Sequence, residues 1–178
     1  MERTVLLLVD LQRALIEEHP DHEQQLLERA QRLLKEARTR GIEAVFVRHD
    51  GSARGTLIPG SAGWELHPAV SPLPGEKIFD KRFCSAFRGT GLRDYLRDRG
   101  ISRIVLIGMQ TEYCIDATCK VAFEYGFDVV IPRGCSSTFD TPRFSGAELC
   151  EFYENRVWNN CFAKVVPAGE AFAAASEG

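Results

Sequence analysis

The feature that most constrains this chain is the alternation of short apolar runs with longer amphipathic stretches. Residues 4–9 and 102–108 are nearly continuous runs of Val, Leu and Ile, which is typical of strands buried on both faces. Residues 21–40 carry leucines and alanines at helical spacing and end at a glycine. Strands that alternate with helices in this way predict a parallel sheet covered by helices on both sides.

The same patterns predict the other elements. Further strands are expected at residues 43–48, 76–80, 127–131 and 162–166, and further helices at 91–99, 111–125 and 142–155. Residues 49–75 hold several Gly and Pro residues without sustained periodicity, so a loop is expected there. The length of 178 residues predicts a single domain over residues 1–178.

The composition excludes several classes of function. A net charge of −3 without a basic stripe argues against a nucleic-acid binder. No apolar run reaches the roughly 18 residues that span a bilayer, and the first run is too short for a signal peptide. We therefore expect no membrane partner and a cytoplasmic location, with the six cysteines reduced.

Three polar residues follow predicted strands at the edge where parallel sheets carry their sites. Asp10 follows the first run, Lys81 follows the third predicted strand, and Cys114 opens the helix after the central strand. A thiol with a pKa near ~8.5 is only slightly ionised at neutral pH, so a nucleophilic cysteine needs a base or a cation. Asp10 and Lys81 could supply these, although each alone also fits a capping group or a surface charge.

The start of the predicted helix is also expected to stabilise a thiolate at Cys114. If Thr111 is the N-cap, Cys114 lies in the first turn of its helix, among unpaired backbone N–H groups. The helix dipole would then favour the thiolate by up to about 1 kcal/mol. A buried structural thiol is the alternative interpretation of the same residue.

Three motifs, in order along the chain, resemble the isochorismatase-like cysteine hydrolases. They are residues 5–12 around Asp10, residues 81–87 beginning at Lys81, and residues 108–114 ending at Cys114. The resemblance covers about residues 4–140, and segment 60–67 is similar to the branch that includes streptothricin hydrolases. It implies an α/β fold, a three-layer α/β/α sandwich with a six-stranded, mainly parallel sheet.

The resemblance also implies a site and an activity. It assigns Asp10, Lys81 and Cys114 to a catalytic triad, with a cis peptide bond before Gln110. The backbone N–H groups of Gln110 and Cys114 would form the oxyanion hole. The implied activity is hydrolysis of a C–N amide-type bond in a small molecule through a Cys thioester, by a homo-oligomer of two or more copies.

A catalytic metal is not expected. Relatives that hydrolyse nicotinamide usually carry an Asp-x-His metal motif after the second strand. Here Asp50 is followed by Ser52 at the histidine position, which leaves His67 as a further candidate ligand. We therefore predict no metal and no cofactor, and nicotinamide is disfavoured as a substrate.

The pocket assignments rest on loop positions. Leu15, Trp64, Phe87 and Tyr113 lie near predicted site loops and could form an apolar wall, or could pack in the core. Arg54 could meet an acidic group of the substrate or remain a solvated charge. Cys84 lies near Lys81 and could reach the pocket, whereas the remaining cysteines show no metal spacing and are expected to be structural: Cys119, Cys135, Cys150 and Cys161.

Other functions stay open at this point. One is hydrolysis of a vinyl ether, as in true isochorismatases, which need not use the cysteine as a nucleophile. A second is a redox-sensing thiol protein without hydrolysis, and a third is a binding scaffold. Dinucleotide binding is disfavoured, because no G-x-G-x-x-G motif follows the first strand.

Overall fold

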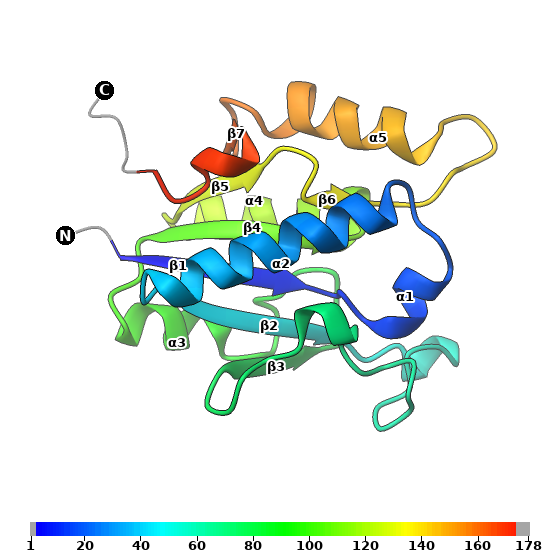
Figure 1. The fold of residues 1–178 in the computed structure, drawn as a ribbon, viewed down its shortest axis with the longest axis horizontal. Coiled ribbons are helices and arrows are strands. Elements are labelled where there is room, and N and C mark those ends of the chain that lie inside the picture. Colours follow the sequence, from blue (N-terminus) through cyan, green and yellow to red (C-terminus); the bar gives the residue numbers. More distant parts are fainter. Residues whose placement is uncertain (1–2, 174–178) are drawn as a thin grey trace.

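Seven parallel strands form the central sheet of the computed structural model, which describes residues 3–173 (Figure 1). Their order is β3-β2-β1-β4-β5-β7, and β6 pairs separately with β4. The strands are β1 (Thr4–Val9), β2 (Glu43–His49), β3 (Lys77–Lys81), β4 (Arg103–Met109), β5 (Asp128–Pro132), β6 (Ser136–Ser137) and β7 (Lys164–Val166). All of these pairings are parallel, so the carboxyl ends of the strands share one edge.

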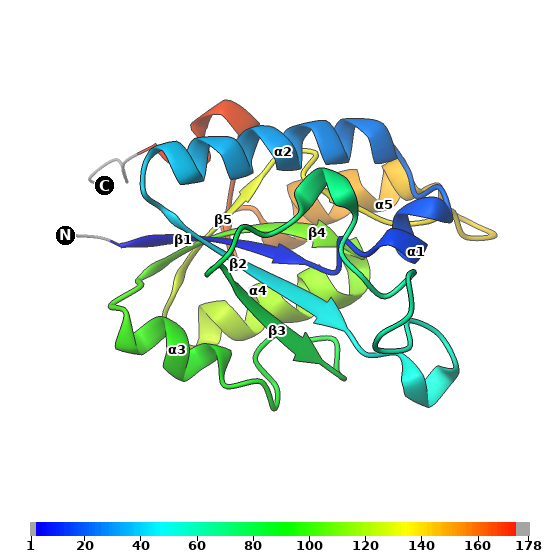
Figure 2. The ribbon, with the colours of Figure 1, turned by 60° about the horizontal axis from the view of Figure 1, so that its bottom comes forward.

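Helices cover both faces of this sheet. Figure 2 shows α2 on one side and α3 with α4 on the other. The helices are α1 (Arg13–Glu17), α2 (Glu23–Thr39), α3 (Leu92–Asp98), α4 (Asp116–Glu124) and α5 (Gly146–Phe152). Within residues 3–173, no helix has the length and apolar character needed to cross a membrane.

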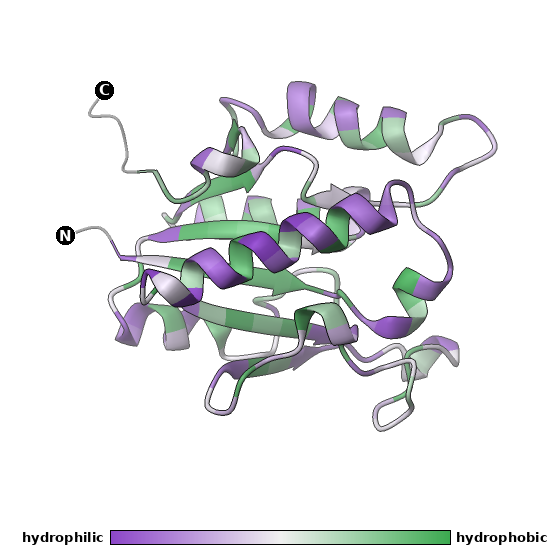
Figure 3. Ribbon diagram, in the orientation of Figure 1, coloured by the Kyte–Doolittle hydropathy of each residue, from purple (hydrophilic) through white to green (hydrophobic). Residues whose placement is uncertain are grey.

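The apolar runs explain this layering. Along β1, Leu6 and Leu8 join the core beneath α2, whereas Val5, Leu7 and Val9 join the core beneath α3 and α4. Figure 3 shows β1 and β4 as mainly hydrophobic, β3 as largely hydrophilic, and α2 as hydrophobic on one face. Strands buried on both faces need apolar residues at every position, which is why they appear as unbroken runs in the sequence.

The structure confirms the predicted α/β/α fold and differs in local elements. The sheet has seven strands rather than six, because β6 is only two serines long and gives no apolar pattern. α1 is five residues long and lies in a stretch for which no element was predicted. The predicted helix over residues 142–155 is α5 followed by a π-helical turn, Tyr153–Trp158.

The helix after β4 also begins differently from the expectation. A π-helical turn, Thr111–Ile115, precedes α4, and its N-cap is Gln110 rather than Thr111. The backbone N–H groups of Tyr113 and Ile115 both donate to the Gln110 carbonyl, at 3.1 Å each. Cys114 therefore still lies in the first turn after the central strand.

Gly108 lets the central strands approach each other closely beside this turn. Its φ is +132°, and an added Cβ would lie 1.9 Å from the Val9 carbonyl oxygen. Any other residue would clash with β1 at this point. One residue further along the chain, the Met109–Gln110 peptide bond is cis. The chain thus passes from β4 into the turn directly beside the end of β1.

Candidate active site

Four neighbouring strands bring polar groups to one edge of the sheet. Lys81 is the last residue of β3 and pairs in register with His49, the last residue of β2. Asp10 directly follows β1, and Gln110 directly follows β4. Because the four strands are parallel neighbours, these residues gather with Cys114 beyond their carboxyl ends.

The Lys81 ammonium is the centre of this cluster. Its Nζ donates to Asp10 Oδ2 at 2.7 Å and to Cys114 Sγ at 3.1 Å, and it lies 3.0 Å from His49 Nδ1. The Lys81 side chain is fully buried. An ammonium has three N–H donors and no acceptor, so these contacts satisfy all three. The structure thus brings the predicted triad together and adds His49.

Asp10 is held in an unusual conformation at the end of β1. The residue is buried and has a φ of +55°, in the left-handed region that non-glycine residues seldom occupy. One carboxylate oxygen accepts from Lys81, while Oδ1 is buried with no hydrogen-bond partner among residues 3–173. A buried carboxylate oxygen without a donor is free to accept a proton.

The electrostatics of Cys114 differ from the expectation of a favoured thiolate. Burial raises the pKa of the Cys114 thiol strongly, and the negative charge of Asp10 raises it further, whereas Lys81 opposes the shift. Burial alone would lower the pKa of Lys81, but Asp10 and Cys114 outweigh it and raise that pKa. At neutral pH the resting thiol is therefore neutral and the ammonium stays charged.

Gln12 fixes the backbone that carries His49, a role that sequence reasoning missed. The buried Gln12 side chain accepts from the His49 N–H at 2.8 Å. Its amide nitrogen donates to the carbonyls of His49 at 3.1 Å and Trp64 at 2.8 Å. The only signal in the sequence was a polar residue close to Asp10.

A cavity of about 570 Å³ opens beside Cys114. Of the predicted pocket residues, Leu15 and Tyr113 line it, and so do Gln110 and Cys84. The remaining residues of the wall come from the ends of β1 and β2 and from the segments that follow β2 and β3: Asp10, His49, Asp50, Gly51, Ala53, Arg54, Thr56, Leu57, Arg82 and Phe83. The 49–75 loop therefore supplies much of the pocket.

Trp64 and Phe87 are corrected by the structure, because both lie outside this cavity. Trp64 is buried, with the Arg48 guanidinium 3.6 Å above its ring centre. Phe87 packs against Tyr125 and Phe127, with ring centroids 5.5 and 6.0 Å away. Both rings are taken up by packing, which was the alternative interpretation.

The Asp50 site does not suit a metal ion. Asp50 Oδ1 accepts from the backbone N–H and the hydroxyl of Ser52, and its Oδ2 accepts from Arg82 Nε at 2.8 Å. These Ser52 hydrogen bonds, with Arg82, lower the pKa of Asp50 to about 2. His67 Nδ1 instead accepts from the Ala69 N–H at 3.2 Å. The carboxylate is saturated with donors, and an arginine already neutralises it.

A second group of possible metal ligands is Asp10, His49 and Cys114, whose ligand atoms lie within 4.8 Å of one another. The Lys81 ammonium contacts all three residues. An ion there would have to displace a buried cation that already satisfies the same groups. The donor set therefore fits an ammonium and not a metal.

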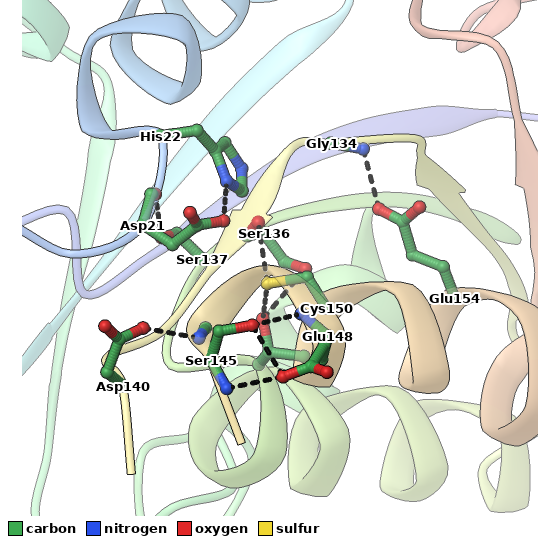
Figure 4. Close-up of polar contacts among 12 residues, drawn as sticks. Asp21, His22, Gly134, Ser136, Ser137, Asp140, Ser145, Glu148, Cys150 and Glu154 are labelled. Atoms are coloured by element: carbon green, nitrogen blue, oxygen red, sulfur yellow. Dashed lines mark hydrogen bonds and ion pairs between the residues drawn. The ribbon is translucent and has the colours of Figure 1, made fainter.

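Cys150 is a second thiol near this edge of the sheet, on α5. Its Sγ lies 3.3 Å from the Thr111 hydroxyl and 3.7 Å from the Ser136 carbonyl oxygen (Figure 4). Ser145 and Glu148 form a capping box that fixes the start of α5. All six cysteines are free thiols.

Comparison with known proteins finds a family whose sequence model matches most of the chain. The isochorismatase domain model matches residues 4–165. A streptothricin hydrolase from Streptomyces noursei is 35% identical over 139 residues, which are 77% of this chain and 50% of the relative. The chain thus spans about half the length of that relative.

Solved structures agree in fold. A structure of the isochorismatase family from Chromobacterium violaceum has a TM-score of 0.87 and 29% identity, covering 96% of this chain and 92% of the other. N-carbamoylsarcosine amidase from Thermoplasma acidophilum has a TM-score of 0.76 and 21% identity, covering 99% of both chains. At that identity the second likeness shows the fold alone.

Proposed function

The chain belongs to the isochorismatase family, and from that premise we propose that it is a cysteine hydrolase cleaving a C–N bond of a small amide. The observation that carries the proposal is the buried Lys81 ammonium, which donates both to the Cys114 thiol and to the Asp10 carboxylate beside a cavity. The hydrolase name of the S. noursei relative is consistent with it.

In the first half of the reaction, Asp10 Oδ1 accepts the thiol proton as Cys114 Sγ attacks the amide carbonyl carbon. The carbonyl electrons move onto oxygen, which the backbone N–H groups of Gln110 and Cys114 stabilise. The C–N bond then breaks, and the leaving nitrogen takes the proton from Asp10. An amine departs and a thioester on Cys114 remains.

In the second half, water replaces the amine. A water molecule gives a proton to Asp10 as its oxygen attacks the thioester carbonyl. The C–S bond breaks, the Cys114 sulfur takes the proton back from Asp10, and the acid leaves. The enzyme returns to its starting protonation state.

Lys81 supports this cycle without transferring a proton. Its pKa is raised by Asp10 and Cys114, so it stays charged throughout. The charge stabilises the developing thiolate and holds the Asp10 carboxylate in place. The raised pKa of Cys114 argues against a redox sensor, which needs an exposed thiol of low pKa.

A screen of small amides, with streptothricin included, tests the proposal by measuring ammonia or amine release. We expect turnover of at least one amide by the wild type and none by Cys114→Ala. Cys161→Ala is the matched control, because Cys161 is exposed and lies outside this cavity. Turnover by Cys114→Ala at the wild-type rate would refute the proposal.

The assembly is a separate proposal, a homo-oligomer of two or more copies. Light scattering on the purified chain tests it, and a monomeric mass at working concentration would refute it.

A further inference from the structure

His49 places a hydrogen-bond donor at the wall of the cavity. Its Nδ1 lies 3.0 Å from Lys81 Nζ, which can only donate, so Nδ1 accepts. Burial, the charge of Lys81 and, more weakly, that of Arg54 lower the pKa of His49 and favour the neutral ring. The single ring proton of a neutral imidazole then belongs to Nε2.

The Nε2 atom is available to a ligand. It makes no hydrogen bond within the described part of the chain. Unlike Asp10 Oδ1, it is not among the fully buried atoms that lack a partner. His49 lines the cavity beside Cys114. Its Nε2–H is therefore a fixed donor within the pocket, oriented by the same ammonium that contacts the thiol.

Arg54 gives the cavity a net positive charge. Two other charged pairs at the cavity are neutralised, since Asp10 pairs with Lys81 and Asp50 pairs with Arg82. Arg54 also lines the cavity, and it has no ion-pair partner among residues 3–173. The Arg54 guanidinium is thus available to interact with a ligand in the cavity.

We propose that His49 and Arg54 form a subsite for a carboxylate of the substrate. The neutral imidazole donates one hydrogen bond through Nε2–H, and the guanidinium supplies charge and further N–H donors. The inference rests on the proposed function and narrows it: the substrate is a small amide that also carries an acidic group near the scissile carbonyl.

Two alkylating probes of nearly equal size test the subsite without any turnover. Iodoacetate carries a carboxylate where iodoacetamide carries a neutral amide. With either probe the Cys114 sulfur bonds to the CH₂ carbon, the C–I bond breaks, iodide leaves, and the thiol proton passes to buffer. The ratio of the two rates at Cys114, mapped by peptide mass, is compared with the ratio at the exposed Cys161 in the same sample. At each cysteine both probes react with the same thiol, so the degree of ionisation of that thiol cancels in the ratio of the two rates.

We expect the normalised ratio to favour iodoacetate by about five- to tenfold in the wild type. Arg54→Gln lowers it towards unity, whereas the charge-conserving Arg54→Lys retains most of it. The preference also weakens with added salt, since Arg54 is exposed.

Two variants separate the nitrogens of His49. His49→Asn keeps an acceptor for Lys81 but loses the Nε2 donor, so it lowers the ratio about threefold. His49→Gln can place an amide N–H at the Nε2 position and retains more of the preference. A purely structural role would predict the opposite order, because only the Asn variant preserves the contact with Lys81.

A normalised ratio near unity in the wild type, or one unchanged by Arg54→Gln, overturns the subsite. This outcome is independent of the proposed function, since alkylation needs no hydrolysis. A strong preference for iodoacetate with no amide turned over would uphold the subsite and refute the hydrolase.

Discussion

Two thiols near the same edge of the sheet, the half-buried Cys114 and the buried Cys150, have different partners. Burial raises the pKa of both, that of Cys150 to about 11 and that of Cys114 still further. Cys150 Sγ contacts a hydroxyl and a carbonyl oxygen. Cys114 contacts the Lys81 ammonium at 3.1 Å, and a carboxylate oxygen without a partner lies nearby. A cation and a base beside the sulfur, together with access to the cavity, therefore distinguish the candidate nucleophile Cys114 from the structural thiol Cys150.

Removing each thiol in turn gives the largest expected contrast. Cys114→Ala should reduce hydrolysis about a thousandfold or more, because the covalent step is lost. Cys150→Ala should keep the activity and cost about 1–2 kcal/mol of unfolding free energy by leaving a small void. Steady-state rates and urea unfolding measure the two effects. Equal losses of activity in the two variants would contradict the assignment of Cys114 as the nucleophile and Cys150 as a structural thiol.

Asp10→Asn should separate the role of Asp10 as a general base from the effect of its charge on the pKa of Cys114. Hydrolysis should fall about 10²- to 10⁴-fold, because no group remains to accept the thiol proton. Thiol ionisation should become easier, since the negative charge that raises the pKa of Cys114 is gone. Iodoacetamide labelling of Cys114 in mildly alkaline buffer should therefore be faster than in the wild type. Slower labelling would show that the sign of the Asp10 interaction is wrong.

Lys81→Met should destabilise the fold as well as the site. It leaves the Asp10 carboxylate buried without its partner, at a cost of about 3–5 kcal/mol. The Asp10→Asn, Lys81→Met double variant removes both charges and should regain much of that loss. Urea unfolding of the four proteins gives the coupling energy. Additive losses would mean that the two side chains do not depend on each other.

The smallest effect is expected at the rim of the cavity. The pKa of Asp50 is lowered to about 2, below its unfolded value of about 3.9, so its contribution to stability is present above the unfolded value and is lost as the pH falls through the folded one. The stability difference between the wild type and Asp50→Asn should therefore shrink in acid below about pH 4. Unfolding curves across this range measure it, and a difference that grows in acid would contradict the assignment.

The sequence predicted the layers, and it placed the three candidate site residues after strands, for reasons that remain visible in the structure. Doubly buried strands need unbroken apolar runs, and a site at the carboxyl edge needs a polar residue directly after each run. Asp10 and Lys81 met that condition, and the motif that ends at Cys114 supplied the third member.

The rest depended on contacts between distant segments. His49 reaches Lys81 only because β2 and β3 pair in register, and Gln12 reaches His49 only because β1 and β2 are parallel neighbours. The pKa of Cys114 reflects burial that the local helix start does not reveal. The sequence does not reveal that the Arg48 guanidinium lies above the Trp64 ring, so it could not distinguish packing of Trp64 from a place in the pocket.

Trapping the acyl-enzyme tests the central claim most directly. The best amide from the screen is mixed with the wild type, the reaction is quenched in acid during turnover, and the peptides are analysed by mass. We expect the peptide with Cys114 to gain the acyl group in place of one hydrogen, and Cys114→Ala to gain nothing. An acyl group on Cys84 instead, or continued turnover by Cys114→Ala without any adduct, would contradict it.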